Sequence, residues 1–132
     1  MFVNDCLNIN EKGHLTIGGC DTVELAKEYG TPLYVLDENT IRTTCRSYVE
    51  SFKKFYNGNG MPLYASKALS CKELCRIANE EHLGLDVVSG GEIYTAQQAG
   101  FPMEKTHFHG NNKTAAEIEF ALKIKAEYEN EK

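Results

Sequence analysis

The sequence predicts an α/β protein built on a parallel β-sheet, and three observations support this. Three β-prone runs, at residues 61–69, 85–89 and 105–110, are each followed by a stretch with helical periodicity. Each helical stretch opens with Ser or Thr followed three residues later by Glu, the pattern of a capping box. Short strands that alternate with helices pair in parallel through right-handed crossovers. The composition, 42% hydrophobic and 25% charged over 132 residues, is that of a globular domain.

The chain begins with two predicted short strands, at residues 6–10 and 14–18. A helix is expected next. Asp21 can cap its start, Glu24 can reach back to the cap, and Gly30 can end it.

A strand and a long helix are expected before the regular region. Residues 31–36 predict the strand, and Asp37 can cap a helix over residues 38–56. The apolar face of this helix comprises Ile41, Cys45, Tyr48, Val49, Phe52 and Phe55. Residues 57–60, with the sequence NGNG, predict a loop.

The regular region contains the three capping boxes. Gly84 and Gly100 are expected to end the first two of its helices. The boxes themselves are Ser70/Glu73, Ser89/Glu92 and Thr114/Glu117.

A (β/α)₈ barrel is favoured over an open dinucleotide-binding sheet, because no Gly-x-Gly-x-x-Gly turn follows the first strand of this region. A complete barrel needs about 250 residues. The chain is therefore expected to hold the first three βα units of a barrel, preceded by a short β segment and a helix.

Lys67 is the first candidate site residue. In a barrel the active site forms at the carboxyl ends of the strands. Alternation along a strand places Leu63, Ala65 and Lys67 on one face, with Lys67 last. An amine there suits imine chemistry with a carbonyl compound. A solvated lysine paired with Asp86 or Glu92 is the alternative.

The next two strand ends supply further candidates. Asp86 and Glu92 lie on and just after the second strand of the region. The third strand ends in the run HFHGNNK, which contains His107, His109, Asn111 and Asn112. His107 and His109 could bind a metal, but no third ligand is placed beside them, so no metal is predicted.

The composition argues against several classes of function. A net charge of −5 without a basic stripe disfavours nucleic-acid binding. The sequence contains no apolar run long enough to cross a membrane and no signal peptide, so a cytoplasmic protein is expected. Five cysteines without a CxxC pair predict neither a disulfide framework nor structural zinc.

Four motifs in order, GTPLYVLDENTIR, YASKALS, LGLDVVSGGEIYTAQQAG and FHGNNKT, resemble the N-terminal third of the diaminopimelate decarboxylases. These are pyridoxal 5′-phosphate (PLP) dependent group III decarboxylases with an alanine-racemase type barrel. The resemblance implies that Lys67 binds PLP covalently. It also implies that Asp86 and Glu92 lie near that lysine, and that His109 and Asn111 lie beside the cofactor.

The resemblance further implies a reaction, meso-2,6-diaminopimelate to L-lysine and CO₂, on a small amino-acid substrate. It implies a homodimer for the full-length family, and a β-domain to which residues 1–20 belong, with residues 21–132 in the barrel domain. The family's phosphate-binding loop and substrate-binding residues lie beyond the matching region, so the chain alone is expected to be inactive. A non-catalytic interaction fragment, an ornithine or arginine decarboxylase and a racemase are the alternatives.

Overall fold

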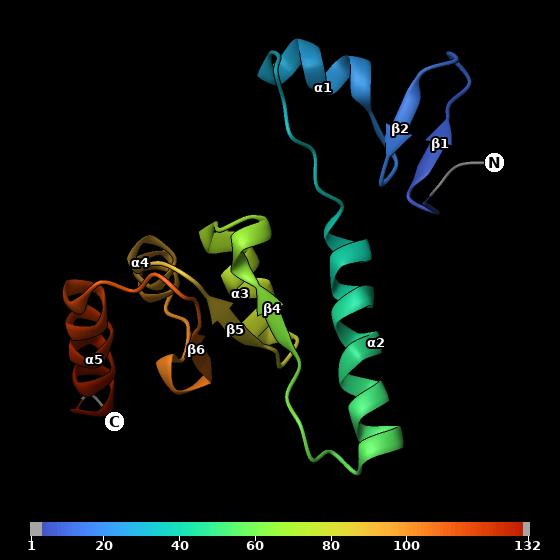
Figure 1. The fold of residues 1–132 in the computed structure, drawn as a ribbon. Coiled ribbons are helices and arrows are strands. Elements are labelled where there is room, and N and C mark those ends of the chain that lie inside the picture. The colour runs from blue at the N-terminus through green and yellow to red at the C-terminus, as the bar shows by residue number, and fades with distance from the viewer. Residues whose placement is uncertain (1–3, 131–132) are drawn as a thin grey trace. The chain divides into compact units, whose positions relative to one another are not determined.

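The structure is a computed structural model that describes residues 4–130. The chain divides into two compact units, Met1–Thr44 and Cys45–Lys132 (Figure 1). The longest helix, α2 (Glu38–Tyr56), runs across the boundary between these units. The division of the chain at residue 20 stays a prediction.

The first unit begins with a three-stranded antiparallel sheet. Its strands, β1 (Leu7–Ile9), β2 (Leu15–Ile17) and β3 (Cys20–Asp21), pair in sequence order. The two strands expected here are confirmed. The additional strand β3 is only two residues long, too short for a hydrophobic alternation to reveal it.

Helix α1 (Thr22–Tyr29) begins at the predicted cap. The Asp21 carboxylate accepts hydrogen bonds from the backbone N–H groups of Val23 and Glu24. It also accepts a bond of 2.8 Å from the Asn10 amide and lies 2.9 Å from His14 Nδ1. The His14 bond is the main cause that holds the pKa of Asp21 far below its usual range.

Residues 31–36 do not form the predicted strand. An extended segment becomes a strand only when another strand completes its hydrogen bonds, and among residues 4–130 no strand pairs with this one. The helix that follows is as predicted, because the Asp37 carboxylate accepts the N–H of Thr40 at 2.8 Å.

The apolar face of α2 is only partly used in the second unit. Cys45 and Val49 pack against the core of that unit. Tyr48 and Phe55 are 58% and 76% exposed. The helical spacing thus identified a real face, but burial along it is uneven.

The second unit is built on a three-stranded parallel sheet. Its strands are β4 (Leu63–Ala65), β5 (Gly84–Val87) and β6 (Thr106–Phe108), in the spatial order β4-β5-β6. Helices α3 (Lys72–Glu80), α4 (Gly90–Gln98) and α5 (Ala115–Asn130) follow the three strands in turn, and short 3₁₀ turns cover Ser66–Ala68 and Met103–Lys105. The predicted α/β class and parallel sheet are confirmed.

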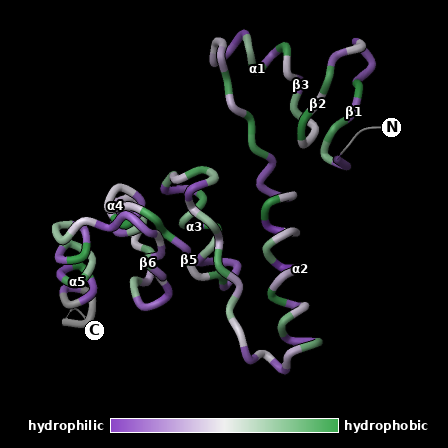
Figure 2. The backbone as a smooth tube through the Cα atoms, viewed as in Figure 1, coloured by the Kyte–Doolittle hydropathy of each residue, from purple (hydrophilic) through white to green (hydrophobic). Residues whose placement is uncertain are grey.

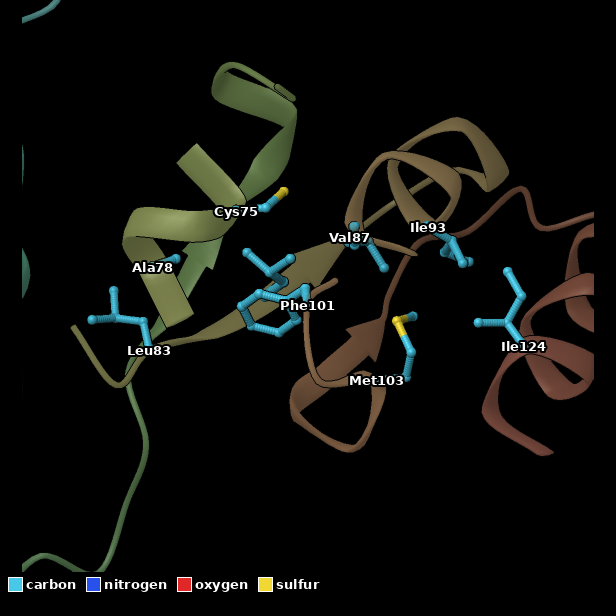
Figure 3. Packing of buried hydrophobic residues seen from close by; sticks show 10 residues of the cluster. Cys75, Ala78, Leu83, Val87, Ile93, Phe101, Met103 and Ile124 are labelled. Carbon is cyan, nitrogen blue, oxygen red and sulfur yellow. The ribbon is translucent and has the colours of Figure 1, made fainter. Parts of the chain in front are cut away.

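The core lies between one face of this sheet and the three helices (Figure 3). Leu85 and Val87 on the central strand and Ala96 of α4 are fully buried. In the hydropathy colouring of Figure 2, β5 shows both hydrophobic and hydrophilic stretches, because Asp86 lies between Leu85 and Val87. Burial of a whole side chain of this size stabilises the fold by about 1.5–3 kcal/mol, so these contacts hold the strands in place beneath the helices.

Two of the three capping boxes are observed in part or in full. At α5 the Thr114 hydroxyl accepts the N–H of Glu117, and the Glu117 carboxylate accepts the N–H of Thr114. At α4 the Ser89 hydroxyl accepts the N–H of Glu92. The predicted cap at Ser70 is wrong, because Cys71 is the cap residue of α3 and Ser70 lies before it.

Gly84 does not end α3, as the sequence suggested. The helix ends at Glu80, and His82, with a φ of 64°, makes the left-handed turn before the next strand. Gly84 is the first residue of β5.

In residues 4–130, none of the helices combines the length and apolar character needed to cross a bilayer.

Candidate functional site

The candidate site lies where the three parallel strands end. Parallel strands present their carboxyl ends at the same edge of a sheet. In the register of the sheet, Ala65 is paired with Asp86, and Asp86 is paired with His107. The segments that follow them therefore leave the sheet at one edge.

The face of the sheet opposite the core carries the polar candidates. Leu85 and Val87 point to the helices, so Asp86 between them points to the other face. Phe108 packs against the core, so His107 and His109 share the face of Asp86. Leu63 and Ala65 of β4 lie on this same side, where Leu63 is 39% exposed.

Lys67 lies in a 3₁₀ turn and not in the strand. Strand β4 ends at Ala65, and the turn Ser66–Ala68 follows directly. The predicted strand alternation of Leu63, Ala65 and Lys67 is therefore wrong at its last member. Lys67 is exposed, and in the part of the chain that the structure describes it forms no ion pair with Asp86 or Glu92. The ion-paired surface lysine is not observed.

Ser66, immediately before Lys67, is buried with 1% of its surface exposed. Its hydroxyl oxygen lies 3.1 Å from the carbonyl oxygen of Asp86 and donates a hydrogen bond to Oε2 of Glu92. No pattern in the sequence singles out Ser66. Its partners are 20 and 26 residues away, so no local pattern could reveal them.

Glu92 uses its carboxylate within the protein. Besides Ser66, its Oε2 accepts the backbone N–H of Val88 at 3.0 Å, and its Oε1 accepts the Ser89 hydroxyl at 3.3 Å. The first turn of a helix favours a carboxylate because the exposed N–H groups there carry partial positive charge. Glu92 therefore joins the start of α4 to the turn that carries Lys67.

The far side of this turn is held by Tyr64. Its hydroxyl donates to the carbonyl oxygen of Leu69 at 3.1 Å, across the segment that contains Lys67. Burial raises the pKa of Tyr64 above its ordinary value.

His109 and Asn111 follow the end of β6. The backbone N–H of His109 donates to the carbonyl oxygen of Val87 at 2.9 Å, which extends the pairing with β5 past Phe108. Asn111 is exposed in the loop. Lys113 Nζ, bonded to the carbonyl oxygen of Gly110 at 2.6 Å, closes that loop.

The described residues fit the aldehyde of PLP better than its phosphate. Lys67 offers an exposed amine at the carboxyl edge of the sheet, which suits covalent attachment. A phosphate would need free N–H groups, such as those at a helix start. At α4, however, Val88 N–H is bonded to Glu92 and Gly90 N–H to Glu117, at 3.0 Å each.

Glu117 links two helix starts. It accepts N–H groups from Thr114 and from Gly90, and these bonds lower the pKa of its carboxyl. The start of α4 therefore already holds a carboxylate where an anion could bind. Within residues 4–130 there is also no group of three His, Cys, Asp or Glu side chains arranged to hold a metal ion.

An apolar cavity of about 330 Å³ lies on the other face of the sheet, between β6, α4 and α5. Ile93, Phe108, Ile118 and Leu122 contribute to its walls. The hydroxyl oxygen of Thr106, also in the wall, is buried and has no hydrogen-bond partner among the described residues.

A family model described as the pyridoxal binding domain of the pyridoxal-dependent decarboxylases matches residues 38–130. The chain belongs to the pyridoxal-dependent decarboxylases. This confirms the family of lyases and the cofactor class that the sequence motifs implied. All five predicted site residues, Lys67, Asp86, Glu92, His109 and Asn111, lie inside the matched domain.

Two curated relatives of this chain are diaminopimelate decarboxylases. The diaminopimelate decarboxylase of Bacillus methanolicus is 53% identical over 122 residues, which make up 92% of this chain and 28% of the relative. That of Bacillus subtilis is 49% identical over the same shares. The chain thus spans little more than a quarter of the length of these relatives.

Two solved structures of diaminopimelate decarboxylases are similar to this chain. The diaminopimelate decarboxylase of M. jannaschii, in complex with L-lysine, has a TM-score of 0.81 and 38% identity, covering 94% of this chain and 29% of that one. The enzyme of Helicobacter pylori, also with L-lysine, has a TM-score of 0.69 and 35% identity, covering 80% of this chain and 26% of that one.

Proposed function

We propose that this chain forms the lysine-bearing part of a PLP-dependent enzyme that converts meso-2,6-diaminopimelate to L-lysine and CO₂. The observation that carries the proposal is Lys67, an exposed amine at the carboxyl edge of a parallel sheet within a pyridoxal binding domain. Relatives that are about half identical over most of the chain are named for this substrate, which supports the choice of diaminopimelate.

Four of the five predicted site residues have a proposed role at the cofactor. Lys67 would hold the cofactor by its amine and release it when the substrate amine arrives. Asp86, on the face of the sheet away from the core, would be the carboxylate nearest to the site and hold the freed ammonium of Lys67. His109 and Asn111, after β6, would border the cofactor from the neighbouring strand end. When bound, PLP supplies the electron sink for loss of CO₂.

The three βα units would form part of a (β/α)₈ barrel, and the full-length enzyme would work as a homodimer. The described residues support attachment of the aldehyde, whereas the N–H groups of Val88 and Gly90 at the start of α4 are already bonded to carboxylates. PLP is held in large part through its phosphate. The 132-residue chain by itself is therefore expected to take up PLP weakly and to release no CO₂.

Borohydride trapping tests the role of Lys67. The purified chain is incubated with PLP, reduced, digested and mapped by mass spectrometry, with CO₂ release from labelled diaminopimelate measured in parallel. We expect the adduct at Lys67 in preference to the exposed lysines Lys54 and Lys72, its loss from this position in K67A, and no CO₂. Equal labelling of all exposed lysines would refute the assigned role.

The substrate is tested in a complex. The chain is co-expressed with the segment of the Bacillus methanolicus enzyme that it does not match, and the purified complex is given diaminopimelate, ornithine or arginine. We expect CO₂ from diaminopimelate and none when Lys67 is replaced by Ala. Release from ornithine or arginine instead would overturn the substrate assignment.

A further inference from the structure

We propose that Ser66 is a positioning residue, whose buried hydroxyl fixes the turn Ser66–Ala68 and thereby sets the direction of the Lys67 amine. Glu92 would act through Ser66 and not by touching the cofactor. The inference rests on the proposed function for its purpose, but the geometry that carries it does not depend on a cofactor.

Ser66 is buried inside an otherwise exposed turn. Within Ser66–Ala68, Ser66 is buried while Lys67 and Ala68 are exposed. The turn has no side-chain cap at its start. A three-residue 3₁₀ turn has few bonds of its own, so its orientation depends on what Ser66 contacts.

Ser66 contacts two partners outside its own turn. Its hydroxyl lies 3.1 Å from the carbonyl oxygen of Asp86 and is bonded to the carboxylate of Glu92. A hydrogen bond with an ionised partner is stronger than one between neutral groups. These contacts connect the turn to the neighbouring strand β5 and to helix α4 at the same time.

The carboxylate of Glu92 is itself anchored by hydrogen bonds. The oxygen that Ser66 contacts also accepts Val88 N–H at 3.0 Å, and the other oxygen accepts the Ser89 hydroxyl at 3.3 Å. A carboxylate with these partners is held at the helix start. It can therefore transmit the position of α4 to Ser66, and through the backbone to Lys67.

The test compares substitutions at both ends of this contact. S66A removes the hydroxyl, S66T keeps one, and E92A removes the acceptor. S66C fills the same space with a weak donor and replaces S66A if that variant fails to fold. T114A is the matched control, because it removes a hydroxyl that caps α5 and whose hydrogen bonds, to Glu117, do not reach the Lys67 turn.

The first readout needs no cofactor. Hydrogen exchange of the Lys67 and Ala68 amides is expected to be about tenfold faster in S66A and E92A, the effect of losing one charge-assisted bond. S66T and T114A should exchange at the wild-type rate in this turn. The double variant S66A/E92A should be no faster than E92A alone, because E92A already removes the Ser66–Glu92 bond that S66A removes.

The second readout is the preference of PLP for Lys67 after borohydride reduction. S66A should lose this preference by about tenfold, while S66T and T114A should keep it. Unchanged exchange and unchanged preference in S66A would overturn the positioning role. If PLP does not label Lys67 even in the wild-type chain, the proposed function fails, and hydrogen exchange still decides whether Ser66 fixes the turn.

Discussion

Replacement of Gly84 by Ala tests how closely the three parallel strands approach one another. A Cβ atom at Gly84 would lie 2.5 Å from Leu63 Cδ2, 2.7 Å from Met61 Cε and 2.6 Å from the carbonyl oxygen of Lys105. The two methyl groups can rotate away. The Lys105 oxygen is backbone that leads directly into β6, so relief requires the strands to separate.

The magnitude follows from these distances. A carbon normally stays at least about 3.3 Å from a carbonyl oxygen, so the Lys105 backbone would have to move by about 0.7 Å. Overpacking of this kind costs about 1–3 kcal/mol. We expect G84A to lower the free energy of unfolding by about 2 kcal/mol, a large part of the stability of a small domain.

Gly91 provides a matched control for the same chemical change. A Cβ at Gly91 would meet only the Ser89 hydroxyl oxygen, at 3.9 Å, which is an ordinary contact. Gly91 lies in the first turn of α4, where Ala is the better helix former. We expect G91A to be neutral or to raise the free energy of unfolding by about 0.5 kcal/mol.

Urea unfolding followed by circular dichroism at 222 nm measures both variants. With a slope of about 1.5 kcal/mol per molar urea, the midpoint of G84A should fall by about 1.3 M, and that of G91A should not fall. A wild-type midpoint for G84A, or an equal loss in G91A, would refute the close approach of the strands.

Two further predictions concern buried and charged groups. T106V replaces the buried hydroxyl of Thr106, which has no partner among the described residues, by a methyl group of similar size. The urea midpoint should rise by an amount that corresponds to about 1 kcal/mol. A lower midpoint would mean that the hydroxyl has a hydrogen-bond partner in solution. The bonds from Thr114 and Gly90 hold the pKa of Glu117 in the folded protein below its ordinary value of 4.5. The stabilisation by the Glu117 carboxylate is therefore complete above pH 4.5, and it is lost as the pH falls through the folded pKa. E117Q should therefore lose less stability than the wild type between about pH 6 and about pH 3, and equal losses would contradict the assigned cause.

Much of the fold and part of the site follow from the sequence. The caps at Asp21, Ser89 and Thr114 form as expected, because a capping bond joins residues two or three positions apart. The strands β5 and β6 were found from their β-prone runs. The motif around Lys67 identified the family and its cofactor.

Other features depended on distant parts of the chain. Residues 31–36 have the composition of a strand, but strand formation needs a partner that no local pattern supplies. Gly84 read as a helix stop, yet its place is set by Lys105, 21 positions away, whose backbone leaves no room for a side chain.

The amino-acid pattern alone led to the prediction that Lys67 carries the reactive amine, because that prediction depends on residue type and order. Only the tertiary structure decided how Lys67 is presented. Ser66 lies in the same turn, and its partners Asp86 and Glu92 come from another strand and another helix. Contacts of this kind arise from packing between units of the sheet, so they exist only once the chain has folded.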